Sequence, residues 1–185
     1  MDARLTPRER DLGLWWVAAT IAGWAVGFVV CEAITSFIST LFIDGLIIGA
    51  GVGIAQWIVL RRRLPDVRWW AGLSILGFGI GRAAGDIATQ GLPTALGEGL
   101  TGAVIGLSVG VAQWLSLRRV FPEAGWWIPA SVIAWTIGWF IISYAEGLTG
   151  SPDVTTYVGG AIGAAFAGIV TGGALIWVSR RARSS

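Results

Sequence analysis

The chain has 185 residues, of which 55% are hydrophobic and 13% are charged, and its formal net charge is +2. Soluble domains have a charged share of about 25%, so this composition excludes an ordinary soluble protein and predicts one embedded in a lipid bilayer. With no histidine and a single cysteine, Cys31, the chain lacks the residues for an internal disulfide, a Cys/His metal cluster or histidine-dependent catalysis.

Six apolar runs follow one another along the chain, each close to the ~17 to 25 residues of a membrane-spanning helix. The first is longer than the roughly 7 to 15 residues of a signal-peptide core, so we expect it to remain as a helix. The predicted fold class is all-α, a polytopic membrane protein in which residues 1–185 form a single transmembrane domain. The predicted spans are residues 14–37, 45–60, 69–88, 99–117, 126–145 and 157–179.

The basic residues predict the orientation. All 13 are arginines, and twelve fall on one side of the predicted spans. Because cytoplasmic loops are enriched in Arg and Lys, this side is predicted to be cytoplasmic, with the N- and C-termini both inside, in the cytoplasmic (inner) membrane of a bacterium. The opposite face is predicted to be acidic, with Glu32, Asp44, Asp86, Glu98, Glu146 and Asp153.

One stretch of the sequence occurs twice. "GVGIAQWIVLRRRLPDVRWW" at residues 51–70 returns 57 residues later as "SVGVAQWLSLRRVFPEAGWW", and 12 of the 22 positions from 49–70 match those from 106–127. This indicates an internal repeat. Trp pairs at 15–16, 69–70 and 126–127 mark the starts of three predicted two-helix units, at about residues 12–63, 64–120 and 121–183. Three parallel copies predict pseudo-threefold symmetry about the membrane normal.

The third unit departs from the pattern. Val170 occupies the place of Gln113 at the same 57-residue offset, and Ile176 occupies it when the units are matched on Trp177. Any threefold site that contains the glutamine is therefore predicted to be broken.

Small residues recur at helical spacing and predict glycine zippers, in which helix backbones approach closely. We expect a compact bundle without a wide pore. The stripes of the even-numbered spans are Gly45, Gly49 and Gly53; Gly102, Gly106 and Gly110; and Gly159, Gly163 and Ala167. Those of the odd-numbered spans are Gly23, Gly27 and Cys31; Gly77, Gly81 and Gly85; and Ala134 and Gly138.

Gln56 and Gln113 lie on the same faces as these glycines. We interpret them as interhelical hydrogen-bonding groups, worth about 0.6 kcal/mol each on average in membranes, with ligand binding as the alternative. Nine of the 12 tryptophans fall near the predicted cytoplasmic interface. They are expected to form an interfacial tryptophan belt, and an aromatic box for a ligand is the alternative.

The arginine clusters have two interpretations that are compatible with each other. They set the topology, and they are candidates for contact with anionic lipid headgroups on the cytoplasmic side. Nucleic acid is a poor partner, because the clusters are short and dispersed close to the bilayer. The candidate headgroup contacts are Arg61, Arg62, Arg118, Arg119, Arg180 and Arg181.

Arg82 is the one arginine predicted to lie inside the membrane, in its outer half. Asp86 follows at i+4 on the same helical face, and Glu32 holds the equivalent position in the first unit, with Ser143 in the third. Glu32, Arg82 and Asp86 form the candidate charge cluster. It is either functional, as intramembrane charges often are, or a neutralised group near the outer surface.

The "AQW[IL]xLRR" endings and "WW" restarts resemble those of small bacterial membrane proteins built from repeated "QW…LRR" two-helix hairpins, for which no activity is established. The resemblance covers most of residues 15–181 and implies architecture alone. The missing third glutamine departs from a regular three-copy pattern.

No catalytic, cofactor or metal motif emerges, so we expect a protein that is not an enzyme and needs no cofactor. The first hypothesis is an assembly or partner-binding module that forms a homo-oligomer or joins a larger membrane complex. The alternative is a small permease or channel that uses Glu32, Arg82 and Asp86. Transporter sites usually lie near the membrane midplane. The predicted spans carry the apolar residues Gly, Ala, Val and Ile at that level, which favours the assembly hypothesis. A third possibility is the binding of a pigment or lipophile, which no feature of the sequence specifically indicates.

Overall fold

The computed structural model describes residues 5–35, 40–64, 66–149 and 152–184, and these residues form six α-helices and one short 3₁₀ turn. In lipid, a helix satisfies every backbone polar group within its own segment, which is why apolar runs of this length become helices. The helices are α1 (Pro7–Thr35), α2 (Leu41–Leu60), α3 (Trp70–Thr89), α4 (Thr94–Leu117), α5 (Trp127–Thr149) and α6 (Pro152–Ser184), with η1 (Ala124–Trp126) before α5.

The observed helices extend beyond several predicted spans. Helix α1 begins at Pro7 and α4 at Thr94, because an apolar run marks the part of a helix that suits lipid and not where the helix ends. Residues 36–37 of the first predicted span lie outside the described part of the chain. Five helices are long and apolar enough to cross a membrane, so the chain is a helical membrane protein. Helix α3, which carries Arg82 and Asp86, falls outside these five.

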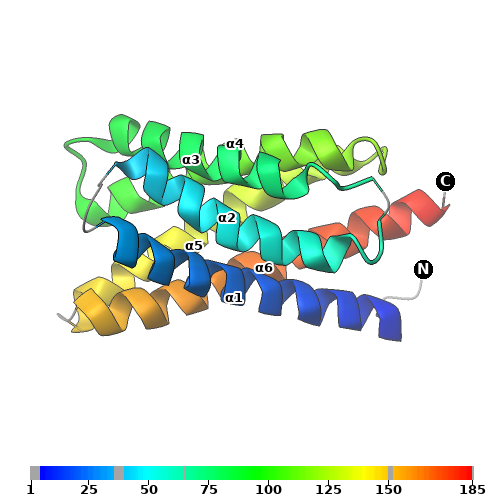
Figure 1. Cartoon of the computed structure of the whole chain (residues 1–185), viewed down its shortest axis with the longest axis horizontal. Coiled ribbons are helices and arrows are strands. Elements are labelled where there is room, and N and C mark those ends of the chain that lie inside the picture. The colour runs from blue at the N-terminus through cyan, green and yellow to red at the C-terminus, as the bar shows by residue number, and fades with distance from the viewer. Residues whose placement is uncertain (1–4, 36–39, 65, 150–151, 185) are drawn as a thin grey trace.

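The six helices form a closed ring in chain order. Each helix packs against its neighbours in the sequence, and α1 packs against α6 to close the circle. Figure 1 shows the helices running side by side along the long axis, with the start of α1 and the end of α6 at the same end of the bundle. We call this the arginine-rich end, because Arg8, Arg61 to Arg63, Arg118, Arg119 and Arg180 lie there. We call the opposite end the acidic end, because Glu32, Asp44, Asp86 and Glu98 lie there.

Glycines allow the close approach of neighbouring helices around the ring. A Cβ atom added at Gly106 in α4 would lie 2.5 Å from the Ser131 carbonyl oxygen of α5, and one added at Gly23 in α1 would lie 2.5 Å from the Gly51 carbonyl oxygen of α2. Real Cβ atoms do not tolerate such distances. At these positions only glycine lets the two backbones meet.

The stripe predicted for α6 is displaced by one residue. Gly159 and Gly163 face α5, where they approach Ile142 and Gly138. The α6 surface that packs on α1 instead carries Gly160 and Gly168; a Cβ added at Gly160 would overlap the Trp24 ring. The predicted grouping of Gly159 and Gly163 with the stripes of α2 and α4 is therefore wrong, because those stripes pack on the next helix along the chain.

Two apolar clusters occupy the interior. The cluster nearer the arginine-rich end is built around Trp16, Trp70 and Trp127, with leucines from α2, α4 and α6. The second cluster contains Trp24, Phe78 and Trp135, with small and β-branched residues of the even-numbered helices. Large aromatic rings bury much apolar area per residue, and here they fill the space that a ring of six helices encloses.

Candidate functional site

Three tryptophans meet at the centre of the ring. Trp70 and Trp127 are the first residues of α3 and α5, Trp16 lies within α1, and all three are almost fully buried. Each ring contacts the other two edge to face, with centroid separations of 5.7, 5.9 and 5.6 Å and interplanar angles of 72°, 81° and 71°. Edge-to-face packing is a favourable geometry for aromatic pairs. We call these three residues the Trp triangle.

The Trp triangle corrects the prediction of an interfacial belt. In each Trp pair the first residue faces outward and the second faces inward: Trp15 is 65% exposed and Trp16 is 0% exposed. Adjacent residues on an α-helix project about 100° apart, so both members of a pair cannot face lipid equally. The second members therefore belong to the core, while Trp15, Trp69 and Trp126 stay at the surface.

Every indole N–H of the Trp triangle donates a hydrogen bond to a side chain on an even-numbered helix. Trp70 donates to Gln56 Oε1 at 3.3 Å, and Trp127 donates to Gln113 Oε1 at 3.0 Å. Trp16 donates to Thr171 Oγ1 at 2.9 Å. The third acceptor is thus Thr171, and neither Val170 nor Ile176 takes that place. The assignment of Val170 or Ile176 to this place is wrong, while the third glutamine is absent as predicted.

A shift in spacing accounts for this error. Thr171 lies 58 residues after Gln113, one more than the 57 residues between Gln56 and Gln113. Gly168 likewise lies 58 residues after Gly110, and both glycines pack on the following helix of the ring. Aligning these two glycines, instead of keeping the fixed period, identifies Thr171 from the sequence.

The glutamine amides connect this layer to hydroxyl groups on the odd-numbered helices. Gln56 Nε2 donates to Thr20 Oγ1 at 3.1 Å, and Gln113 Nε2 donates to Ser74 Oγ at 2.8 Å. Gln113 Nε2 also lies 3.4 Å from Gln56 Oε1, which it reaches across the interior. The equivalent hydroxyl on α5, Ser131 Oγ, is buried without a hydrogen-bond partner among the described residues. Thr171 carries no amide to donate to it.

A cavity of about 700 Å³ opens at the arginine-rich end. Its walls include Leu12, Leu60 and Leu175, and its edge carries Arg8, Arg62 and Arg63. We call it the arginine-edged cavity.

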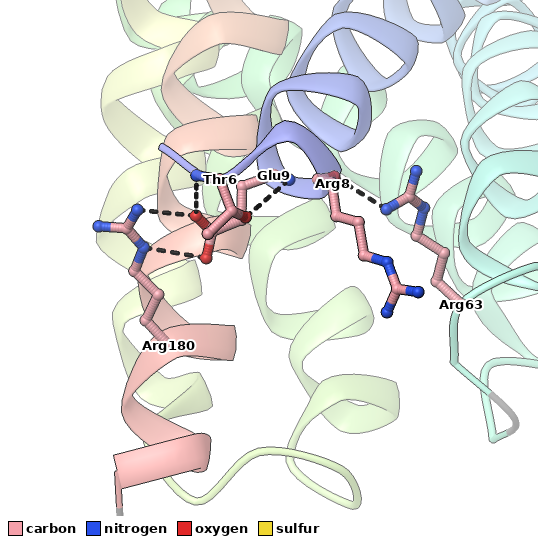
Figure 2. A network of polar contacts seen from close by, with 5 residues as sticks. All are labelled: Thr6, Arg8, Glu9, Arg63 and Arg180. Carbon is pink, nitrogen blue, oxygen red and sulfur yellow. Dashed lines mark hydrogen bonds and ion pairs between the residues drawn. The ribbon is translucent and has the colours of Figure 1, made fainter. Parts of the chain in front are cut away.

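Two polar contacts hold the edge of this cavity in place (Figure 2). Arg180 of α6 makes a two-pronged ion pair with Glu9 of α1, from Nε to Oε1 at 3.0 Å and from Nη2 to Oε2 at 2.7 Å, and the Thr6 backbone N–H also donates to Glu9 Oε2. Arg63 Nη1 donates to the Arg8 carbonyl oxygen at 2.9 Å. The first contact joins α1 to α6, and the second joins α1 to the segment after α2.

The six arginines predicted to contact lipid headgroups have different surroundings. Arg180 is paired with Glu9, and Arg62 lies at the edge of the arginine-edged cavity, whereas Arg119 is exposed. The other three lie over tryptophan rings four residues earlier, a cation–π geometry. These are Arg61 over Trp57 at 4.7 Å, Arg118 over Trp114 at 4.9 Å and Arg181 over Trp177 at 4.6 Å.

At the acidic end the structure brings together two members of the predicted charge cluster and separates the third, Asp86. Glu32 and Arg82 line a cavity of about 280 Å³ together with Asp44 and Glu98. The Arg82 guanidinium lies 5.8 Å from the centre of the Trp139 ring. Among the described residues, Asp86 does not line this cavity, and its carboxylate lies beyond ion-pair distance of Arg82. The predicted pairing at i+4 is therefore absent from this arrangement.

Within the described part of the chain, no three His, Cys, Asp or Glu residues are grouped so as to hold a metal ion. Comparisons with family models, curated proteins and solved structures gave no match.

Proposed function

We propose that the protein is a non-enzymatic integral membrane module that assembles with copies of itself or with a larger membrane complex, and that contacts anionic lipids. The supporting observation is the filled interior. The Trp triangle closes the ring near one end, and Trp24, Phe78 and Trp135 form a second aromatic cluster beyond it. Binding then takes place on the surfaces and in the end cavities, and the axis of the ring serves to hold the helices together.

The same proposal includes a pseudo-threefold arrangement of three two-helix units. The near-equal separations within the Trp triangle support it, as do the three indole hydrogen bonds to Gln56, Gln113 and Thr171. All six helices cross the membrane in this arrangement, with α3 held between α2 and α4. The arginine-rich end faces the cytoplasm of a bacterium, in accordance with the distribution of arginines.

The assembly proposal is tested by the mass of the protein extracted with its native lipids. The full chain is released from bacterial membranes in polymer-bounded discs and weighed by native mass spectrometry. We expect a homo-oligomer, or a complex of fixed stoichiometry, with anionic lipids attached. A single chain with no associated protein, at every concentration examined, contradicts the proposal.

A permease is the second candidate, and it is favoured by the cavity of about 280 Å³ at the acidic end, which we call the acidic-end cavity. Three carboxylates, from Glu32, Asp44 and Glu98, and one guanidinium, from Arg82, line that cavity. Ionisable groups within a membrane often mark a solute path. The assembly proposal predicts no specific flux of simple cations or small neutral solutes through proteoliposomes. A saturable flux that disappears in a folded variant carrying Glu32→Gln and Arg82→Gln would instead establish the permease.

A further inference from the structure

The arginine-edged cavity has the volume of a ligand site. Its volume of about 700 Å³ lies within the ~300 to 1,000 Å³ of typical small-molecule sites, which combine apolar walls with a few polar groups. Leu12 of α1, Leu64 after α2 and Ile176 of α6 form apolar wall over the buried Leu60 and Leu175, and Phe121 from the segment after α4 contributes an aromatic ring. Segments distant in the sequence therefore build one apolar surface that is partly open to the outside.

The edge of this cavity is positively charged. Arg8, Arg62 and Arg63 lie around it, and Glu9 is the one acidic residue among its lining residues. The Glu9 carboxylate already accepts both prongs of Arg180, so its negative charge is balanced by a fourth arginine. In Figure 2 the Glu9–Arg180 pair lies to one side of Arg8, and Arg63 approaches Arg8 from the other side. Three guanidinium groups thus remain for an anion.

We propose that the arginine-edged cavity binds an anionic amphiphile. The carboxylate or phosphate group of the ligand contacts Arg8, Arg62 and Arg63, whose forked N–H groups match acid oxygens. Its hydrocarbon part lies against Leu12, Leu64 and Ile176. A free fatty acid and an anionic phospholipid share this chemistry. This inference rests on the proposed function, which places the chain in a membrane. It assigns the proposed contact with anionic lipid to one cavity.

Positive charge on the cytoplasmic side is common to membrane proteins, but it does not require a cavity. Arg61 and Arg118 lie over tryptophan rings at the surface, and Arg119 is exposed. The pair Arg62–Arg63 at the cavity and the pair Arg118–Arg119 outside it therefore offer a matched comparison. Both pairs carry the same charge and follow the ends of even-numbered helices, with Arg63 at the position where the second repeat has Val120.

The experiment measures equilibrium binding of labelled palmitate to the full chain in discs of zwitterionic phosphatidylcholine. We expect one saturable site per chain. The Arg62→Gln/Arg63→Gln variant should bind palmitate at least tenfold more weakly, and the Arg118→Gln/Arg119→Gln variant should stay within twofold of the parent. Ser179 also lines the cavity, and Ser179→Phe fills its space, so this variant should also bind at least tenfold more weakly.

Competition identifies the source of the ligand. Phosphatidylglycerol that displaces palmitate assigns the site to phospholipid, and failure to displace it assigns the site to fatty acid. Inorganic phosphate should displace neither, because it lacks a hydrocarbon part. Each of four results would overturn the proposal. These are equal weakening of palmitate binding by the two double-arginine variants, unaltered palmitate binding in Ser179→Phe, displacement of palmitate by inorganic phosphate, and no saturable binding of palmitate to the parent. Thermal melting identifies variants that fail to fold. If the Arg62→Gln/Arg63→Gln variant fails to fold, the Ser179→Phe variant tests the cavity instead.

Self-assembly is measured separately by native mass. Failure of the assembly proposal can therefore be distinguished from failure of the ligand site.

Discussion

Replacing Gln113 with leucine should destabilise the ring, because Trp127 then loses the acceptor of its indole hydrogen bond. The Trp127 Nε1 to Gln113 Oε1 distance is 3.0 Å, and both side chains are buried. Leucine has a similar volume, so the loss is mainly polar. Ser74 loses the amide donor at 2.8 Å but keeps its own hydrogen bond to the Trp70 carbonyl.

The expected cost follows from these contacts. An interhelical hydrogen bond in a membrane is worth about 0.6 kcal/mol on average and at most about 1.7, whereas a buried donor without a partner costs about 1 to 3 kcal/mol. Gln113→Leu creates one such donor, at Trp127. We therefore expect a loss of about 1 to 3 kcal/mol in the free energy of unfolding. The control Gln90→Leu changes an exposed glutamine that follows α3 and should stay within about 0.5 kcal/mol of the parent.

A double-mutant cycle separates the hydrogen bond from changes in packing. Free energies of unfolding are measured in mixed micelles for the parent, Gln113→Leu, Trp127→Phe and the double variant. The double variant removes donor and acceptor together, so we expect a favourable coupling of about 1 kcal/mol, above the ~0.3 to 0.5 kcal/mol scatter of independent sites. Additive effects, or a more stable Gln113→Leu protein, would show that the tryptophan–glutamine layer does not support the ring.

Three further outcomes are expected. Gly106→Ala should lower the melting temperature in detergent by several degrees, because the added Cβ meets the backbone of α5. Gly72 has open space around it, so Gly72→Ala should change the melting temperature little. Equal melting temperatures would place the Gly106 stripe against lipid. Glu9→Gln should also lower the melting temperature, because it breaks the ion pair between α1 and α6. The control Asp11→Asn changes an exposed side chain and should leave the melting temperature unchanged. A lower melting temperature for Asp11→Asn than for Glu9→Gln would contradict ring closure by the Glu9–Arg180 pair. In a Cys31→Ser background, single cysteines placed at either chain end should react only with reagents on the cytoplasmic side, and labelling from opposite sides would refute the six-span topology.

The glycine stripes of α2 and α4 marked packed faces correctly, but hydrophobicity alone could not predict which other residues turn inward, for a physical reason. In a soluble helix the apolar stripe marks the buried face, but a helix in lipid is apolar on every side. Trp15 and Trp16 have the same chemistry, yet one faces outward and the other forms part of the Trp triangle. The repeat alignment makes the three Trp pairs equivalent without stating which member of a pair turns inward.

The end cavities depend on contacts between distant segments. Glu9 and Arg180 are 171 residues apart in the sequence, and they meet only because α6 returns to α1. The sequence predicted arginines at this end, but it did not predict that Arg8, Arg62 and Arg63 surround one cavity. At the acidic end, the sequence grouped Glu32, Arg82 and Asp86 by spacing. The contacts of the ring instead place Asp44 and Glu98 beside Glu32 and Arg82.

A density map of the protein in its native lipids tests the closed ring and the lipid site most directly. We expect continuous side-chain density across the ring at the Trp triangle, and contacts with a second copy or a partner. In the arginine-edged cavity we expect an elongated density with its head at Arg8, Arg62 and Arg63. A continuous water-filled path from the acidic-end cavity past Trp16, Trp70 and Trp127 would contradict the closed ring and support the permease.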